Sequence, residues 1–324
     1  MAFHIFITRD FAQMSRVAAD IVEADIKQKQ AAKVAKSEYV LGLATGSSPT
    51  GLYKHLAQAF NDGRLDAARV RSFNLDEYVG LPGENAQQRC LHRESYNYFM
   101  IQELFGLLRT KFVETNIPWG TLVEQSELIA ALDEHPGEYE MQGSGQGKAI
   151  IIKDGASGIL GSIKRDILDE YERKIKAAGG IDLQIVGVGG RGHVAFHEIG
   201  IPFEGNHMLL VKLDDNTVEN AVQDGHFPSI AESPHYAISM SAELIYQAPA
   251  VVLLASGSRK TGPVAESVLG DVTCDVPISY GQKYVAAGGQ LFYVLDEVAA
   301  AELLARRAEA EAKGVIIEDL RAKV

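Results

Sequence analysis

The sequence predicts an α/β fold: a doubly wound, mainly parallel sheet with helices on both faces. Segments with the period of a strand alternate with segments of helical period along the chain, which favours such a sheet. Three loops, 44–51, 74–78 and 187–198, directly follow expected strands. Because ligands bind beyond the carboxyl ends of the strands in this class, these loops predict a common site. We expect a single α/β domain over residues 1–324.

The amino-terminal elements are recognised from short apolar runs and a change of period. Residues 3–8 form an apolar strand, and after Arg9 the side chains of Phe11, Met14 and Val17 fall on one face of a helix. Further strands are expected at 38–44 and 70–75, and helices at 52–60 and 95–108.

The carboxyl-terminal half repeats the alternation. Expected strands cover residues 181–188, 208–213, 250–255 and 290–295, and expected helices cover residues 166–178, 242–246, 259–268 and 298–312. The last helix is rich in charge and alanine, as an exposed helix would be. Residues 121–160 break the rhythm with acidic patches and the glycine-rich run GSGQGKAIIIKDGASGILG. We interpret this segment as a surface insertion containing a β-hairpin with residues 149–153 as one strand, and a lid is the alternative.

The composition limits the partners. A formal net charge of −12 argues against nucleic acid and against an anionic membrane surface. Two cysteines, Cys90 and Cys274, are too few for a disulfide framework and fit a reducing compartment. No apolar run reaches the roughly 18 residues of a membrane span, and the first residues lack a signal-peptide pattern. We therefore expect a cytoplasmic protein.

The first candidate loop, LATGSSPTGLY, enters a helix through Pro-Thr-Gly. The N–H groups at the helix start, with the hydroxyls of Thr45, Ser47 and Ser48 and the backbone of Gly46, can hold a phosphate. The alternative is a turn whose hydroxyls cap its own helix. The loop is neither a Walker pattern nor a dinucleotide fingerprint.

The second candidate loop, FNLDEYVGL, places two carboxylates directly after an apolar strand. Asp76 and Glu77 are adjacent, so in an extended chain their side chains point to opposite sides. One can face a cleft and act as a general base, because partial burial raises its pKa, while the other faces the scaffold. The alternative is an aspartate that caps a helix.

The third candidate loop, GVGGRGHVAFHE, carries a histidine and a glutamate behind four residues from Gly187 to Gly190. Glu198 can orient His193, and such a pair suits proton transfer at a sugar ring. The spacing of His193, His197 and Glu198 does not favour a metal. A fourth loop, ASGSRKTG, offers Lys260 at a helix start, where it can meet a phosphate.

The chain resembles the glucosamine-6-phosphate deaminase/isomerase family, whose superfamily also holds the 6-phosphogluconolactonases. The resemblance rests on LGLATGSSPTGLYKHL, SFNLDEYVGL, ESYNYFM, NIPWG, YERKIKAAGGIDLQIVGVGGRGHVAFHE, SPHYAISMSAELI and VVLLASGSRK. It spans nearly the whole chain except residues 121–160, and NLDEYVGL and SYNYFM indicate the deaminase branch. It implies that Asp76 moves a proton between C2 and C1 of an open-chain sugar. It also implies that His193, oriented by Glu198, assists ring opening, and that Gly46, Ser47, Ser48 and Lys260 hold the phosphate of an amino-sugar phosphate, with no cofactor or metal.

The sequence departs from the family at several positions. Gly190 and Arg191 stand where the family has Asn-Asp, and that aspartate normally completes a carboxylate–histidine–carboxylate set. We expect Arg191 to lower the pKa of His193 and to pair with Glu198. Two roles stay open for it: it reaches a carboxylate or phosphate of the substrate, which would indicate a different sugar acid or sugar phosphate, or it disables ring opening. His197 replaces an asparagine, and a downstream phosphate-binding arginine has no counterpart in NTVENAVQ, residues 216–223.

Three functions remain open from the sequence. The first is an isomerase/deaminase acting on an amino-sugar or hexose phosphate, with Asp76 as the base. The second is a sugar-phosphate lactonase-type hydrolase, in which His193 activates water and Arg191 binds an acidic group. The third is a non-catalytic sugar-phosphate-binding protein. The sequence leaves assembly as a homo-oligomer open.

Overall fold

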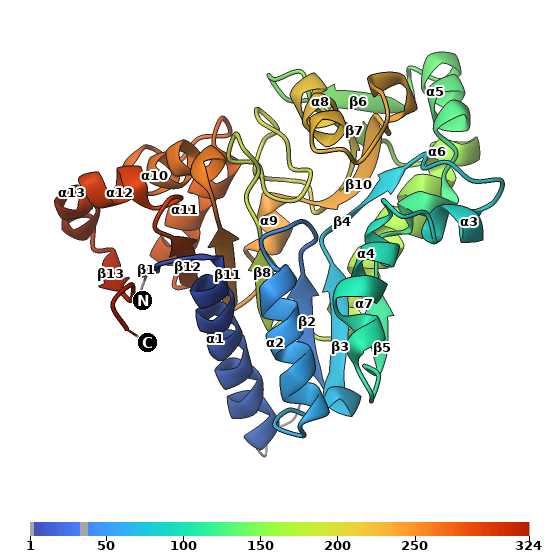
Figure 1. Ribbon diagram of the computed structural model, residues 1–324. Helices are drawn as coiled ribbons and strands as arrows, with labels where there is room; N and C mark the ends of the chain where they lie inside the picture. The colour runs from blue at the N-terminus through green and yellow to red at the C-terminus, as the bar shows by residue number, and fades with distance from the viewer. Residues whose placement is uncertain (1–2, 33–37, 324) are drawn as a thin grey trace.

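The computed structural model describes residues 3–32 and 38–323. Within these residues, one sheet is formed by β1 (Phe3–Thr8), β2 (Tyr39–Leu43), β3 (Val70–Asn74), β5 (Glu114–Asn116), β8 (Leu183–Val186), β11 (Ala250–Ala255), β12 (Gln290–Asp296) and β13 (Ile316–Asp319). Its order is β13-β1-β12-β11-β8-β2-β3-β5, and every pair is parallel (Figure 1). The predicted α/β class is confirmed.

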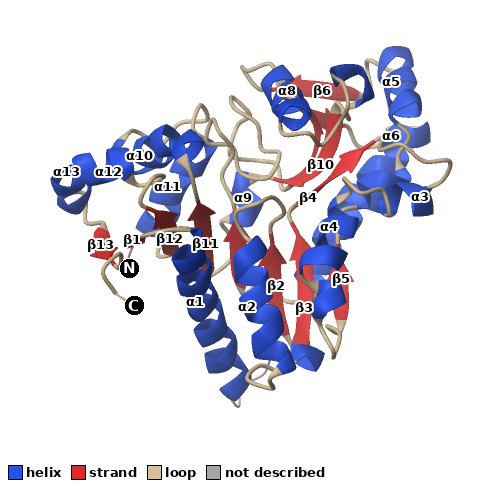
Figure 2. Cartoon of the chain, viewed as in Figure 1, coloured by secondary structure: helices blue, strands red, loops and turns tan. Residues whose placement is uncertain are grey.

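Helices cover both faces of this sheet, as the sequence predicts (Figure 2). One face packs on α1 (Phe11–Ala31), α2 (Thr50–Asn61) and α4 (Tyr96–Glu103). The other face packs on α7 (Glu170–Ala177), α9 (Ala242–Ile245), α10 (Thr261–Leu269), α11 (Tyr280–Ala286), α12 (Ala301–Ala305) and α13 (Arg307–Ala312). The central strands are buried on both faces, so their sequences are continuous apolar runs.

A second sheet, which the sequence did not predict, lies beside the first. It contains β4 (Asp76–Val79), β6 (Tyr139–Gln142), β7 (Lys148–Ile152), β9 (Met208–Lys212) and β10 (Tyr236–Met240). The order is β4-β10-β9-β7-β6, with every pair antiparallel. The strand expected at 208–213 therefore exists but does not extend the parallel sheet. Its apolar residues are buried on both faces, like those of a parallel strand.

The second sheet also has helices on both faces. One face packs on α8 (Asp215–Gln223), and the other on α5 (Gln125–Glu134) and α6 (Gly158–Ser162). The hairpin expected within 121–160 is present as β6 and β7. That this segment is an insertion, and that the chain is one domain, stay predictions.

Three expected helices differ clearly from the structure. The helix expected at 166–178 begins within a π-helix over Ile163–Asp169, and α7 starts only at Glu170. The helix expected at 95–108 ends at Glu103, and a short 3-10 turn follows over Phe105–Leu107. Gly106 lies in this turn, where a Cβ would come within 2.4 Å of the carbonyl oxygen of Ile101. The helix expected at 298–312 is divided into α12 and α13 at Arg306. The short α3 (Ala86–Cys90) completes the α-helices of the described residues.

The two sheets meet at Leu75, the residue between β3 and β4. Its N–H donates to the carbonyl of Leu43 in the parallel sheet, and its carbonyl accepts from the N–H of Met240 in the antiparallel sheet. Because β11, β8, β2 and β3 are successive neighbours, the loops at their carboxyl ends share one edge. The four candidate loops therefore gather at the junction of the sheets (Figure 1). No helix in the described part of the chain combines the length and apolar content that crossing a bilayer requires.

Candidate functional site

Asp76 and Glu77 begin β4, where the chain leaves the parallel sheet. In this extended strand their side chains point to opposite sides, as predicted. The Glu77 carboxylate accepts hydrogen bonds from the backbone N–H groups of Tyr78, Tyr96 and Asn97, the last two at the first turn of α4. Glu77 is thus the carboxylate that faces the scaffold.

Asp76 lies on the opposite side of the strand and is 5% exposed. Within the described residues its carboxylate accepts no hydrogen bond. Burial, and then the neighbouring charge of Glu77, raise the pKa of Asp76 well above its ordinary value. A carboxyl group without protein partners and with a raised pKa is suited to take up and return a proton.

The glycines before His193 make room for its ring. A Cβ at Gly189 would lie 1.9 Å from Nε2 of His193, so only glycine allows the imidazole to rest on this backbone. The N–H of Gly189 donates to the carbonyl of His193 at 2.9 Å, which closes the loop. Ala195 follows in a left-handed conformation with φ of 49°. This tight turn directs the N–H of Phe196 to Oγ of Ser239, the partner of Asp76 across the β4–β10 ladder.

An aromatic cluster joins the histidine loop to the strand of Asp76. The centroid of the Phe196 ring lies 5.2 Å from the ring centroid of Tyr78 and 5.9 Å from that of Tyr96. Phe227 packs on the same tyrosine, Tyr78, at 5.6 Å. Edge-to-face and offset contacts of this kind stabilise packing beyond the area that they bury.

His193 and Glu198 form the predicted pair. Nδ1 of His193 lies 3.6 Å from Oε2 of Glu198, whose side chain is 2% exposed. Burial is the largest effect, and it lowers the pKa of His193. The negative charges of Glu198 and Asp214 raise this pKa, and the positive charges of Lys260 and Arg191 lower it further. The net shift is downward, so the imidazole is neutral near pH 7 and can accept a proton.

The expected pairing of Arg191 with Glu198 is wrong. The half-exposed Arg191 instead places its guanidinium 3.4 Å from Oδ1 of Asp214, the residue that caps α8. Burial raises the pKa of Asp214, but hydrogen bonds from Asn216 and the charge of Arg191 hold it below its ordinary value. The expected direction of the effect of Arg191 on the pKa of His193 is confirmed.

The loop after β2 leaves its donors free. The N-cap of α2 is Pro49, which makes no side-chain capping hydrogen bond, so the alternative of a turn that caps its own helix is wrong. Gly46 has a φ of 92°, and Ser47 beside it is exposed. The hydroxyls of Thr45, Ser47 and Ser48 have no protein partner among the described residues, and the loop can therefore hold a phosphate.

Lys260 stands at the start of α10, after β11. It is half-buried, and no carboxylate of the described residues lies within ion-pair distance of its ammonium group. Burial and then the charge of Arg259 lower the pKa of Lys260, while Asp224 opposes the shift. Because β11 and β8 are neighbouring parallel strands, Lys260 lies at the same edge of the sheet as the histidine loop.

His197 is a structural residue. It is fully buried; Nδ1 accepts from the N–H of Ala242, and Nε2 donates to the carbonyl of Ile201. Burial lowers its pKa to about 4, so it stays neutral. No group of three or more His, Cys, Asp or Glu side chains within 3–32 and 38–323 is arranged to hold a metal ion.

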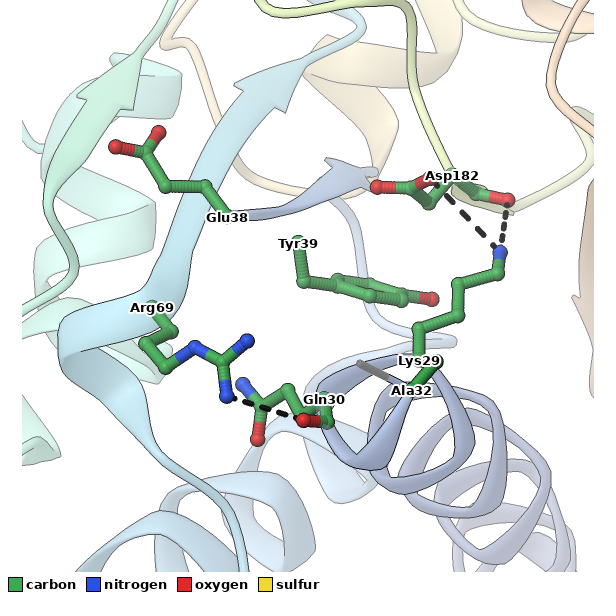
Figure 3. Close-up of a pocket in the computed structure, with 7 residues that line it drawn as sticks. All are labelled: Lys29, Gln30, Ala32, Glu38, Tyr39, Arg69 and Asp182. Carbon is green, nitrogen blue, oxygen red and sulfur yellow. Dashed lines mark hydrogen bonds and ion pairs between the residues drawn. The ribbon is translucent and has the colours of Figure 1, made fainter. Parts of the chain in front are cut away.

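Two cavities accompany these elements. A cavity of about 390 Å³ adjoins Arg191 and is lined further by Ile199, Gly262, Pro263, Glu266, Asp275 and Val276. A smaller cavity of about 110 Å³ lies at the amino ends of β2 and β8, where Lys29 is close to Asp182 (Figure 3). None of the predicted site residues lines the second cavity.

Sequence reasoning missed Asp214 as a member of this site. Its N–H donates to Oε1 of Glu198 at 3.3 Å, and its charge acts on His193. The signal in the sequence is an aspartate at the start of the helix in LDDNT, typical of an N-cap. That signal could not reveal that α8 begins beside the histidine loop.

The comparisons with known proteins point to one family. No family model matches the chain. The glucosamine-6-phosphate deaminase of Clostridium botulinum (strain Loch Maree / Type A3) is 31% identical over 299 residues, which cover 92% of this chain and 98% of that protein. The glucosamine-6-phosphate deaminase of Thermoanaerobacter sp. (strain X514) is 33% identical over 276 residues, covering 84% and 86%.

Solved structures support the same fold. A monomeric glucosamine-6-phosphate deaminase superposes with a TM-score of 0.68 at 24% identity, covering 93% of this chain and 100% of the other. The 6-phosphogluconolactonase from Trypanosoma cruzi gives a TM-score of 0.58 at 20% identity, covering 94% and 98%. At these identities the structural likeness concerns the fold alone.

Proposed function

The chain belongs to the glucosamine-6-phosphate deaminase family, and from this premise we propose that it converts an amino-sugar phosphate and water into a ketose phosphate and ammonia. Glucosamine 6-phosphate is the first substrate to test, since it is the one that the relatives' names give. The observation that carries the proposal is Asp76, a buried carboxyl group that has no hydrogen-bond partner among the described residues and lies at the edge of the sheet that also holds His193.

Ring opening is the first proposed step. Neutral His193 takes the proton of the anomeric hydroxyl while the bond between C1 and the ring oxygen breaks, and Glu198 stabilises the imidazolium. The imidazolium then gives this proton to the ring oxygen, which becomes a hydroxyl. The low pKa of His193 supports this role, because the imidazole has to be neutral before it accepts the proton.

Proton transfer between carbons is the second proposed step. The Asp76 carboxylate removes the proton from C2 of the open-chain sugar while the C1 oxygen takes up a proton from water, which gives an enolamine. Asp76 then returns a proton to C1 as the nitrogen loses one to water, which leaves an imine at C2. Water adds to this imine, the C–N bond breaks, and ammonia leaves as the ketose forms.

The phosphate is proposed to lie between the loop after β2 and Lys260. The free hydroxyls of Ser47 and Ser48, the backbone of Thr45 and Gly46, and the N–H groups at the start of α2 would donate to its oxygens. Arg191 is proposed as an additional donor, since Asp214 engages one edge of its guanidinium. We further propose that the enzyme acts in the cytoplasm; its assembly as a homo-oligomer stays a prediction.

The test is ammonia release from purified protein. Glucosamine 6-phosphate should yield ammonia and a ketose phosphate in equal amounts, and Asp76→Asn should lower kcat by about a hundredfold or more. In deuterated water, the product should carry deuterium at C1. Absence of ammonia from every hexosamine 6-phosphate tested would refute the proposal. Lactone hydrolysis that survives Asp76→Asn but not His193→Ala would favour the hydrolase instead.

A further inference from the structure

The loop between β6 and β7, residues 143–147 with the sequence GSGQG, packs on the segment that carries Glu198. The N–H of Ser144 donates to the carbonyl of Gly200 at 3.0 Å. A Cβ at Gly145 would lie 2.5 Å from the carbonyl oxygen of Ile199, so the backbones approach more closely than a side chain allows. The hairpin is thus in direct contact with the candidate site.

Gly147 makes the closest approach to the acidic groups. A Cβ at this position would lie 2.7 Å from Cβ of Glu198 and 3.2 Å from the backbone nitrogen of Asp214. The backbone of Gly147 also contributes to lowering the pKa of Asp214. The register of the β7–β9 ladder, with Lys148 opposite Lys212, sets this contact.

We propose that loop 143–147 is a positioning element of the proposed active site: Gly147 holds the Glu198 side chain against His193 and fixes Asp214 beside it. This inference rests on the function proposed above, in which His193 moves a proton. It assigns to the hairpin a part in catalysis that is exerted through Glu198 and Asp214, without contact to the substrate.

The geometry leaves Glu198 little freedom. Its side chain is 2% exposed, one oxygen accepts from the N–H of Asp214, and the other faces Nδ1 of His193. The backbone of Gly147 packs against Cβ and Cγ of Glu198, since a Cβ added to Gly147 would lie 2.8 Å from Cγ of Glu198. A Cβ at residue 147 therefore cannot be added without a shift of Glu198 or of the loop, and in our proposal this shift moves the carboxylate away from the imidazole.

Asp214 supplies a second negative charge at the histidine. Its N–H donates to Glu198, and its carboxylate accepts from Asn216 and pairs with Arg191. Its charge opposes the fall of the His193 pKa. The set of two carboxylates around the histidine is thus completed from the start of α8.

The decisive variant is Gly147→Ala, because no left-handed conformation is required at this residue. We expect kcat for ammonia release to fall by about tenfold to a hundredfold with KM nearly unchanged, since catalytic groups are sensitive to displacements of about 1 Å. The pKa of His193, followed by NMR of the imidazole ring, should fall because the Glu198 charge moves away. Lys260 and Arg191, the cations that face the ring, are unchanged in this variant.

Gly137→Ala is the matched control. Gly137 lies in the same hairpin region and is exposed, and a Cβ added to it would meet no atom within 4 Å. Wild-type kcat and an unshifted His193 titration are expected for this control. The same wild-type values in Gly147→Ala would overturn the proposal. If the unmodified protein releases no ammonia, the proposed function fails, whereas the His193 titration still decides whether Gly147 positions the pair.

A second variant keeps the test decisive if Gly147→Ala does not fold. Asp214→Asn keeps the hydrogen bond from the backbone N–H of residue 214 to Glu198 and keeps a side chain that can cap α8. It removes the negative charge of Asp214. The pKa of His193 should then fall, because a cation at the ring loses a stabilising neighbour. An unchanged His193 titration in Asp214→Asn would exclude Asp214 from the set.

Discussion

At the scale of single residues, the contacts of loop 187–198 explain how the positive charge of Arg191 is tolerated close to His193. Arg191 lowers the pKa of His193, but its guanidinium is paired with Asp214, whose charge has the opposite effect. The ion pair therefore cancels part of the repulsion that the arginine alone would produce. The sequence predicted the repulsion and the His193–Glu198 pair, but not the compensating aspartate, because nothing local links residues 191 and 214.

The Glu198–His193 contact makes a prediction that does not depend on turnover. In Glu198→Gln the imidazolium loses its nearest negative charge, so the pKa of His193 should fall below that of the wild type. NMR titration of the His193 ring measures it, and kcat should drop by up to about a hundredfold. A rise of the pKa would contradict the assigned contact.

At the scale of elements, β4 turns two adjacent carboxylates to opposite sides: Glu77 binds the start of α4, and Asp76 is the proposed base. The extended geometry of Asp76 and Glu77 was predictable, since neighbouring side chains alternate across a strand. The partner of Glu77 was not, because it is the start of α4, about twenty residues away. The second sheet was equally hidden, because β9 and β10 have apolar sequences that suit a parallel or an antiparallel neighbour.

The buried Glu77 predicts a pH dependence of stability. Burial raises its pKa from 4.5 to about 7, against the hydrogen bonds from the α4 backbone. Its proton is held more tightly in the folded state, so this contribution to stability is present at low pH and is lost as the pH rises through 7. Relative to Glu77→Gln, the wild-type unfolding free energy should decline by about 3 kcal/mol between pH 4 and pH 8.

Urea denaturation at several pH values measures this difference. Because Asp76 also titrates and is influenced by Glu77, the same pair is compared in an Asp76→Asn background. A constant difference across the pH range would show that Glu77 does not titrate in this window.

At the scale of the whole molecule, the candidate site depends on strand order. The loops after β2, β3, β8 and β11 were found from the sequence because each follows an apolar run. Their meeting could only be assumed, and the order β11-β8-β2-β3 supplies it. Residues that reach the site from the antiparallel sheet, Gly147 and Asp214, required the structure.

The convergence of the β2 and β11 loops predicts how the phosphate is held. Lys260→Met keeps the length and apolar character of the side chain but removes its charge. We expect KM for glucosamine 6-phosphate to rise about tenfold to a hundredfold, the equivalent of one hydrogen bond to a charged group, with a smaller change in kcat. Steady-state kinetics decides, and an unchanged KM would remove Lys260 from the phosphate site.

The position of β1 has a consequence for biosynthesis. This first strand pairs with β12 and β13, which come from residues 290–319. While the ribosome is still adding the middle of the chain, β1 has neither neighbour. The hydrogen-bonding partners of its backbone are nearly three hundred residues away in the sequence. The parallel sheet is therefore completed late in synthesis, and β1 stays unpaired until the final strands have left the ribosome.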